Sequence, residues 1–389
     1  MRVGVVAYEM EGQRSGVGRY LEGLLQGLVD VGDDSTWRLY FKGSPFDHPL
    51  WNPEREGVPT IEPVFDHRPS ARPIAWEQTR LPFRMRGDAL DLVFSPGYSL
   101  PPLVDVPAVL TLHDLSFEHL PTEFGWKERW RRRHLARLGS RRAARVLADT
   151  ETIADDLVRT YDLPREKVGI VPLAVDRRFF SPLDPPEGSA DDLDAGLEAL
   201  GVERPYVLFI GSVLPRRRLD LALAAFRRLV DQGAVGRPSI RFVLAGNDRL
   251  PDSSVDALIA EQELQNRVVR LDYAPEELLP ALYARAEASI YLSTYEGYGL
   301  PPLESLAAGT PAVVAPGLAL DDLVVDYAFR VERLEVDAVT DTLRRALDDP
   351  KRARIVDDAR AAVRRLSWAR CALRLRRELE RALADAAAR

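Results

Sequence analysis

Cysteine and histidine are scarce in this sequence. Its 389 residues include one cysteine, Cys371, and five histidines. A single thiol cannot form a disulfide within the chain, and a zinc site made of cysteines needs several of them. The histidines are scattered and lack the spacing that is typical of metal ligands. The scarcity excludes a disulfide-stabilised scaffold and predicts that the protein has no metal site.

Long apolar runs and an excess of positive charge are also missing. No run is long enough to span a membrane. The net charge is −7, whereas proteins dedicated to nucleic acid are normally basic overall. The first apolar run is followed at once by Glu9 and Glu11, which is typical of a buried strand and not of a signal peptide. We therefore expect a cytoplasmic protein that binds no nucleic acid.

Short apolar runs alternate with helical patterns along the whole chain. The length is sufficient for two domains with separate cores. Strands that alternate with helices predict mostly parallel sheets and an α/β fold. Residues 181–204 carry clusters of proline, glycine, aspartate and glutamate, which predict a linker. We expect domains at 1–178 and 205–366, a linker region at 179–204 and a C-terminal helix at 367–389.

The most informative stretch is Tyr291–Gly309, which reads YLSTYEGYGLPPLESLAAG. Ala288–Leu292 predicts a buried strand, and Leu303–Ala308 predicts a helix. Glu296 then lies in a loop at the carboxyl end of a strand, and Glu304 lies in the first turns of the next helix. Ligands of open α/β sheets bind at that edge. Ionised carboxylates accept strong hydrogen bonds from sugar or ribose hydroxyls.

The whole stretch closely resembles the E-x7-E signature of the retaining glycosyltransferases of family 4. The signature reads Glu296-GYGLPPL-Glu304 and continues with an AxGTPxV string that starts at Ala308. Members of this family have the GT-B fold, so the resemblance implies two Rossmann-like domains that face each other across a cleft. It also implies that the last helix, which begins with Ser367-Trp368, packs back on the N-terminal domain.

The resemblance implies roles for the residues of the signature. Glu296 would contact hydroxyls of the transferred sugar, and Glu304 would hold the ribose. The loop between them would approach the donor; its residues are Gly297, Tyr298, Gly299 and Leu300. Two solvated glutamates in an ordinary strand–loop–helix turn are the alternative interpretation.

Two further motifs of the family occur in the first half of the chain. Gly16 and Gly18 begin a helical pattern after the first strand, and helix N-termini with glycine attract phosphate groups. They match the GGxGRY loop of the family, which approaches the donor diphosphate and the acceptor, although Ser15 stands in place of a glycine. His113 ends the AVLTLHD strand and matches a His-Asp motif that lies near the reacting sugar. A tight turn and a structural histidine are the alternatives.

The second half of the chain opens with a strand that ends at Gly211 and a turn with three arginines. The family pattern there is GxxxPRKN, whose Arg and Lys clamp the donor diphosphate. Arg216 matches the Arg, and Arg217 stands for the Lys with a planar cation in place of a point charge. Arg218 replaces the Asn. By the same resemblance, Gly211 lies at the donor and the backbone near Tyr273 would hold the nucleobase.

The segment Trp126–Arg145 is strongly basic, with nine Lys or Arg residues and one Glu. It has three interpretations. The first is a solvated helix that packs on the domain by its other face. The second is a patch that docks peripherally on anionic lipids of the inner membrane through Trp126, Trp130 and the basic residues. The third, a nucleic-acid patch, is opposed by the acidic total.

Together these motifs predict a retaining glycosyltransferase that moves a sugar from a nucleotide diphosphate to a glycan, lipid-linked or small-molecule acceptor and requires no cofactor. Trp76-Glu77-Gln78 and Leu81-Pro82 resemble a WEQxxLP segment of bacterial members that build surface polysaccharides, which favours GDP-mannose over a UDP-sugar. A sugar phosphorylase or a nucleotide-sugar epimerase on the same fold is an alternative. A non-catalytic glycan- or lipid-binding protein is another. An Asp192-Leu193-Asp194 triplet lies in the polar stretch, so we do not expect it to bind metal.

Overall fold

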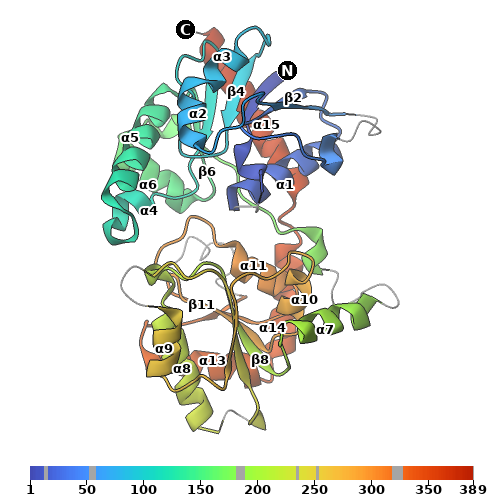
Figure 1. Cartoon of the computed structure of the whole chain (residues 1–389), viewed down its shortest axis with the longest axis vertical. Coiled ribbons are helices and arrows are strands. Elements are labelled where there is room, and N and C mark those ends of the chain that lie inside the picture. The colour runs from blue at the N-terminus through green and yellow to red at the C-terminus, as the bar shows by residue number, and fades with distance from the viewer. Residues whose placement is uncertain are drawn as a thin grey trace. The chain divides into compact units, whose positions relative to one another are not determined.

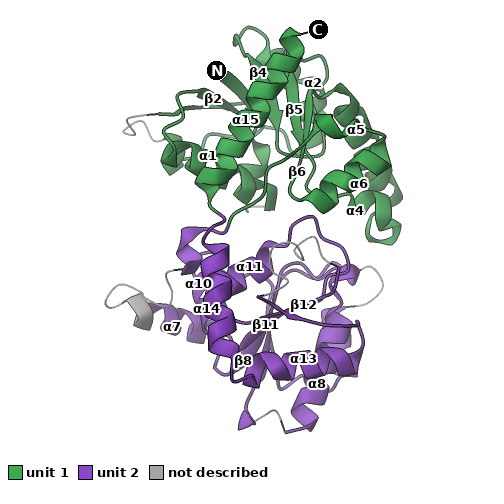
Figure 2. Ribbon diagram, turned by 180° about the vertical axis from the view of Figure 1, so that it is seen from behind, with its two compact units in different colours: residues 1–174, 367–389 green, residues 175–366 purple. Residues whose placement is uncertain are grey.

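The computed structural model describes residues 1–12, 16–51, 58–180, 189–233, 236–250, 254–317 and 327–388, with residues 189–191 described by their backbone only. The chain divides into two compact units (Figure 2). Unit 1 consists of Met1–Ala174 and Ser367–Arg389, and unit 2 consists of Val175–Leu366. The stretch 179–204, which the sequence analysis assigned to a linker, lies inside unit 2 and includes helix α7, Ser189–Ala199.

Unit 1 is built on a parallel sheet that, within the described residues, has seven strands in the order β3-β2-β1-β4-β5-β6-β7. The strands are β1 Arg2–Val6, β2 Thr36–Phe41, β3 Thr60–Phe65, β4 Leu92–Ser95, β5 Ala108–Thr111, β6 Arg145–Ala148 and β7 Val168–Ile170. Nearly all residues of the central strands are buried, because helices cover both faces of the sheet.

Helices of unit 1 come from both ends of the chain. They are α1 Gly16–Asp30, α2 Pro73–Thr79, α3 Leu81–Met85, α4 Ser116–His119, α5 Trp126–Arg142, α6 Glu151–Tyr161 and α15 Trp368–Ala387. Helix α15 lies against α1 (Figure 1). A Cβ atom at Gly23 would overlap the ring of Trp368, and one at Gly27 would overlap its backbone. Because glycines four residues apart share one helix face, they let α15 approach α1 closely.

Unit 2 has a second parallel sheet, which in the described ranges contains six strands in the order β10-β9-β8-β11-β12-β13. The strands are β8 Tyr206–Ile210, β9 Arg241–Ala245, β10 Val268–Leu271, β11 Ala288–Tyr291, β12 Ala312–Val314 and β13 Phe329–Arg330. The helices besides α7 are α8 Leu219–Asp231, α9 Val255–Glu261, α10 Leu279–Ala284, α11 Leu300–Ala307, α13 Val336–Asp348 and α14 Arg352–Val363. Each half of the chain therefore has the Rossmann-like sheet that the sequence predicts.

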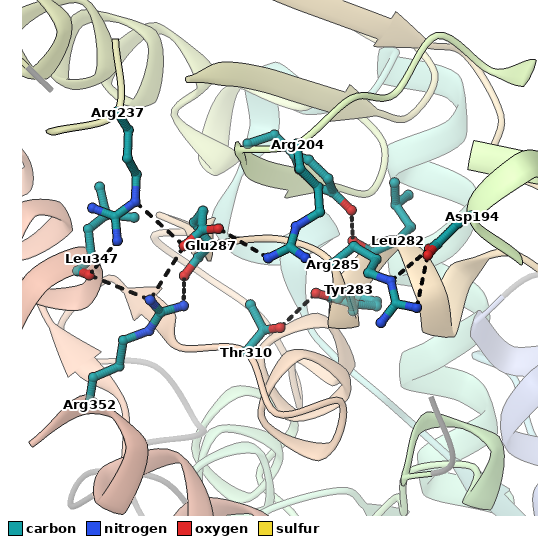
Figure 3. Close-up of polar contacts among 11 residues, drawn as sticks. Asp194, Arg204, Arg237, Leu282, Tyr283, Arg285, Glu287, Thr310, Leu347 and Arg352 are labelled. Atoms are coloured by element: carbon teal, nitrogen blue, oxygen red, sulfur yellow. Dashed lines mark hydrogen bonds and ion pairs between the residues drawn. The ribbon is translucent and has the colours of Figure 1, made fainter. Parts of the chain in front are cut away.

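Arginines hold the amino end of β11 in unit 2 (Figure 3). Glu287, directly before β11, shares its carboxylate among three guanidinium groups, those of Arg204, Arg237 and Arg352, at N–O distances of 3.4, 3.6 and 3.5 Å. In the same region Arg285 binds Asp194 of α7 at 2.7 Å. These ion pairs fix the edge of the sheet opposite to the carboxyl ends of the strands.

A buried ion pair ties α15 to the sheet of unit 1. Nε of Arg145, the first residue of β6, donates to Oε2 of Glu378 at 2.9 Å, and both side chains are buried. A Cβ atom at Gly169 of β7 would overlap the same carboxylate, so a glycine is needed there. Removal of one partner leaves the other charge buried and uncompensated.

We therefore expect Glu378→Ala to lower the free energy of unfolding by about 3–5 kcal/mol. Urea denaturation of the full chain measures this. The matched control is Glu380→Ala in the same helix, whose side chain is half exposed and pairs with Arg376 across one helical turn at 3.0 Å. That exposed pair is expected to contribute less than about 1 kcal/mol. Equal losses in the two variants would show that the buried pair does not anchor α15.

Candidate active site

The sheet of unit 2 reverses its strand order between β8 and β11. The loops after two such strands run in opposite directions, and ligands of open α/β sheets bind at this switch point. Gly211 directly follows β8, and Glu296 lies in the loop after β11. Two predicted segments that are far apart in the sequence, Gly211–Arg217 and Glu296–Glu304, therefore start from neighbouring strands.

Arg217 lies at the centre of this region. Its Nε donates to Oε1 of Glu296 at 3.1 Å, and its Nη1 donates to the carbonyl oxygen of Ser212 at 2.9 Å. Its guanidinium carbon lies 5.6 Å from the ring centre of Tyr291. Gly211 leaves room for this group: a Cβ atom there would overlap Nη1 of Arg217, and φ is +109°. The structure thus gives Gly211 a role in seating Arg217.

Glu296 is largely shielded from solvent beside two arginines, with its side chain 11% exposed. Nε of Arg216 lies 3.7 Å from its Oε1, and Oγ of Ser293 donates to the same oxygen at 3.0 Å. Burial by itself raises the pKa of Glu296, but the charges of Arg217 and Arg216 outweigh it, so the pKa lies below its ordinary value. The carboxylate is therefore ionised at neutral pH. Two cations and one anion leave a net positive charge, which suits a diphosphate.

The loop after Glu296 leads into α11. Gly299 precedes the helix with φ +91°, a conformation that favours glycine, and Leu300 is the first helical residue. Gly297 and Tyr298 are buried. Glu304 is also buried, and its Oε2 accepts a hydrogen bond from the Tyr283 hydroxyl at 2.9 Å. The interpretation of Glu304 as a solvated glutamate is therefore wrong.

Tyr273 lies elsewhere on the same edge. It follows β10, and β9 separates that strand from β8. Its side chain is 53% exposed. The structure does not join Tyr273 to the arginine cluster through any contact among the described residues.

Unit 1 reverses its strand order between β1 and β4. Gly16 is the first residue of α1 and is exposed. A Cβ atom at Gly18 would overlap the carbonyl oxygen of Glu9, so this glycine lets the turn after β1 pack on the start of α1. Tyr20, one turn further along α1, contacts the His113 ring edge-on with centroids 4.7 Å apart. The two predicted motifs of unit 1 are therefore in contact.

His113 follows β5 and lies between two hydrogen-bond acceptors. Its Nδ1 is 2.8 Å from Oδ2 of Asp149, and its Nε2 is 2.9 Å from the carbonyl oxygen of Pro96. A neutral imidazole has one N–H, so both contacts are hydrogen bonds only when the ring is protonated. Burial by itself lowers the pKa of His113, but the carboxylate of Asp149 and the two hydrogen bonds outweigh it and raise the pKa. The geometry indicates an imidazolium.

Sequence reasoning did not single out Asp149 or Tyr291. Asp149 directly follows β6, the neighbour of β5, and a polar residue at that edge is the signal that could have identified it. Tyr291 is the last residue of β11 and is buried, so in the sequence it resembles any apolar strand residue. Its contact with Arg217 depends on the pairing of β11 with β8.

The part of the chain that the structure describes has neither a cluster of metal ligands nor a membrane-spanning helix. It contains no group of three or more His, Cys, Asp or Glu side chains arranged to hold a metal ion. In the same residues, no helix is both long and apolar enough to cross a lipid bilayer. Asp194 of the D-x-D triplet is bound to Arg285.

Two protein families match the chain, one in each half. Residues 14–179 match "Glycosyltransferase Family 4", and residues 197–362 match "Glycosyl transferases group 1". Together the two matches cover most of the chain. They define the class of protein, an enzyme that transfers sugars and has the GT-B fold. The chain is a glycosyltransferase whose first half belongs to family 4 and whose second half belongs to group 1.

Named relatives agree with this class. The chain is 25% identical to the O-antigen chain mannosyltransferase B of Escherichia coli, with 92% of this chain and 93% of the relative aligned. It is 29% identical to the MMP alpha-(1->4)-mannosyltransferase of Mycolicibacterium hassiacum, over 72% of this chain and 67% of the relative. The sucrose-phosphate synthase of Thermosynechococcus elongatus has a similar structure, with a TM-score of 0.75, 18% identity and 99% of each chain covered. This last likeness shows the fold alone.

Proposed function

We propose that this protein is a retaining mannosyltransferase that moves mannose from GDP-mannose to a hydroxyl group of a glycan, lipid-linked or small-molecule acceptor. The relatives from Escherichia coli and Mycolicibacterium hassiacum are both named mannosyltransferases, which supports mannose as the sugar. The WEQxxLP-like segment, which begins at Trp76, supports the same donor.

The observation that carries the proposal is the cluster of Arg216, Arg217 and Glu296 at the switch point of unit 2. In the proposed reaction the two arginines hold the diphosphate and stabilise the charge that develops on it as the bond to the sugar breaks. Glu296 accepts hydrogen bonds from sugar hydroxyls and keeps Arg217 in place. Glu304 holds the ribose, and the loop from Gly297 to Leu300 lies along the donor.

Unit 1 has a separate part in the proposal. His113 donates from Nε2 to a hydroxyl of the sugar, in place of its bond to the Pro96 carbonyl. The start of α1 at Gly16 and Gly18 approaches the phosphates, because helix N-termini favour anions. A donor phosphate oxygen accepts the proton of the attacking hydroxyl on the face from which the diphosphate leaves. Attack on that face retains the anomeric configuration.

The first experiment is a thermal-shift panel with GDP, UDP, ADP and TDP, each with and without magnesium. A nucleotide at about 100 times its Kd stabilises the fold by about 2.7 kcal/mol, which raises Tm by a few degrees. We expect the largest shift with GDP, present without magnesium. Glu304→Gln keeps the shape of the side chain and should reduce this shift. The control Asp358→Ala, at an exposed position of helix α14, should leave it unchanged.

Other outcomes separate the alternatives. A shift with UDP alone would overturn GDP-mannose as the donor and leave the transferase intact. Turnover that needs inorganic phosphate would indicate a phosphorylase, and an epimerised donor without acceptor would indicate an epimerase. If no nucleotide binds, the chain is a glycan- or lipid-binding protein on a transferase fold. The NMR signal of the anomeric proton reports the configuration of the product. A configuration opposite to that of the donor would exclude retention.

A further inference from the structure

Helix α5 presents an exposed stripe of large side chains that the proposed reaction does not use. Trp126 is 76% exposed, Trp130 is 65% exposed and Leu138 is 44% exposed. Successive positions lie four and eight residues apart, so they follow one side of the helix. His134 completes the stripe, with its ring stacked on that of Trp130 at 5.3 Å. Exposed apolar groups that lie together on one face mark an interaction site.

Basic side chains flank the stripe along its whole length. The Lys127 ammonium lies 5.3 Å from the centre of the Trp126 ring. Further exposed arginines stand on either side of the stripe, namely Arg131, Arg133, Arg137, Arg141 and Arg142. The whole chain has a net charge of −7, so this positive charge is a local feature of α5. It attracts an anionic partner to this face in particular.

The opposite face of α5 fixes the helix to unit 1. Ala136, Gly139 and Ser140 are buried. Nε of Arg129 donates to the carbonyl oxygen of Phe117 in α4 at 3.0 Å. Helix α5 runs beside α4 and α6 at the surface of unit 1 (Figure 1). The stripe is therefore held on a rigid element and turned away from the core.

We propose that the stripe formed by Trp126, Trp130, His134 and Leu138 docks unit 1 on the surface of an anionic lipid bilayer. Tryptophan rings are stable at the depth of the lipid headgroups. Lysine and arginine beside them attract anionic headgroups, and lasting attachment of a surface helix needs both contributions. A nucleic-acid duplex would engage the arginines through its phosphates and leave the tryptophans unused, whereas a bilayer explains the arginines and the tryptophans together.

Sedimentation of the full chain with lipid vesicles tests this proposal. We expect binding to vesicles of phosphatidylcholine with phosphatidylglycerol and little binding to phosphatidylcholine alone, and salt should weaken it. The double variant Trp126→Ala/Trp130→Ala should bind about tenfold more weakly or worse. Arg131→Glu/Arg141→Glu should lose the preference for the anionic lipid. A thermal melt of each variant confirms that it is folded.

The matched control is Phe83→Ala. Phe83 is 63% exposed in α3 of the same unit and has Arg86 over its ring at 5.2 Å, so it reproduces the cation–aromatic chemistry at another site. Its loss should leave vesicle binding unchanged. Vesicles with brominated lipids should quench the tryptophan emission of the wild type and much less that of the double tryptophan variant.

Three results would overturn the proposal. They are the absence of vesicle binding, binding that survives the loss of both tryptophans, and tighter binding to duplex DNA that depends on the arginines alone. The sugar-transfer proposal concerns other residues, so none of these results bears on it. A nucleotide panel without any shift would, in turn, leave the membrane proposal standing.

Discussion

Arg217→Ala is expected to lower kcat/KM for sugar transfer by about a hundred- to a thousandfold, the usual loss when one preorganised donor to a developing anion is removed. Arg217 is held by Glu296, by the Ser212 carbonyl and by the face of Tyr291, so its position is set before any ligand arrives. Alanine leaves Arg216 as the remaining cation beside Glu296. The thermal-shift panel identifies the nucleotide of the donor. The rate at which that nucleoside diphosphate is released from the sugar donor then measures the loss of kcat/KM.

The three consecutive arginines provide their own control. Arg218 is partly exposed and pairs with Asp220 at 3.0 Å, away from Glu296. Arg218→Ala should therefore change kcat/KM by less than about twofold, because exposed ion pairs contribute little. Gly211→Ala should also lower kcat/KM, because its Cβ atom overlaps Nη1 of Arg217 and a φ of +109° disfavours any residue but glycine. Equal losses at Arg217 and Arg218 would exclude a specific role for Arg217.

The pH dependence of stability gives a second test of this cluster. The pKa of Glu296 is lowered in the folded protein, so its ion pairs stabilise the fold above the unfolded pKa of about 4.3 and are lost as the pH falls through the folded value. Arg217→Ala removes the nearer cation and raises the pKa of Glu296. Acid unfolding followed by circular dichroism should therefore begin at a higher pH in the variant than in the wild type.

Asp149→Asn is expected to lower kcat/KM at pH 7 by about ten- to a hundredfold. The amide oxygen can still accept the Nδ1–H of His113, so the variant removes the charge and keeps the shape. Loss of an adjacent opposite charge lowers the pKa of a histidine by about 1–3. At neutral pH a smaller fraction of the rings is then protonated. A neutral ring donates a weaker hydrogen bond from Nε2 to a sugar hydroxyl than an imidazolium does.

The sign of the pH effect follows from the raised pKa of His113. The attraction to Asp149 stabilises the fold fully below the unfolded pKa of about 6.5 and is lost as the pH rises through the folded value. The difference in unfolding free energy between the wild type and Asp149→Asn should be widest near pH 6 and should shrink in alkali. Activity of the wild type should fall as the pH passes the pKa of His113, and that fall should move to lower pH in the variant.

A second histidine pair serves as the control. Nε2 of His119 lies 2.8 Å from Oδ2 of Asp156, the same distance as between His113 and Asp149, but His119 is exposed. Asp156→Asn should leave the pH profile of kcat/KM where it is. A profile that shifts equally in both variants, or in neither, would contradict the role assigned to Asp149.

The amino-acid sequence was sufficient to predict the general architecture of two parallel-sheet domains. Strands with nearly continuous apolar residues predict parallel sheets, because both faces of such a sheet are covered by helices. The order of the motifs along the chain was sufficient to predict the family. These motifs contain Gly18, His113, Arg216 and Glu296. Local patterns of this kind survive in the sequence because each depends on neighbouring residues.

Strand order decided the rest. It places Asp149 beside His113 and Tyr291 beside Arg217, and these pairs are far apart in the chain. The tertiary structure also buries Glu304 against Tyr283. In the same way, Gly211 leaves room for Arg217 only because the chain folds back there. The sequence by itself determined which residues stand at the ends of strands. Only the tertiary structure decided which of those ends meet, because the pairing of parallel strands is set by packing across the whole sheet and not by the residues next to each site.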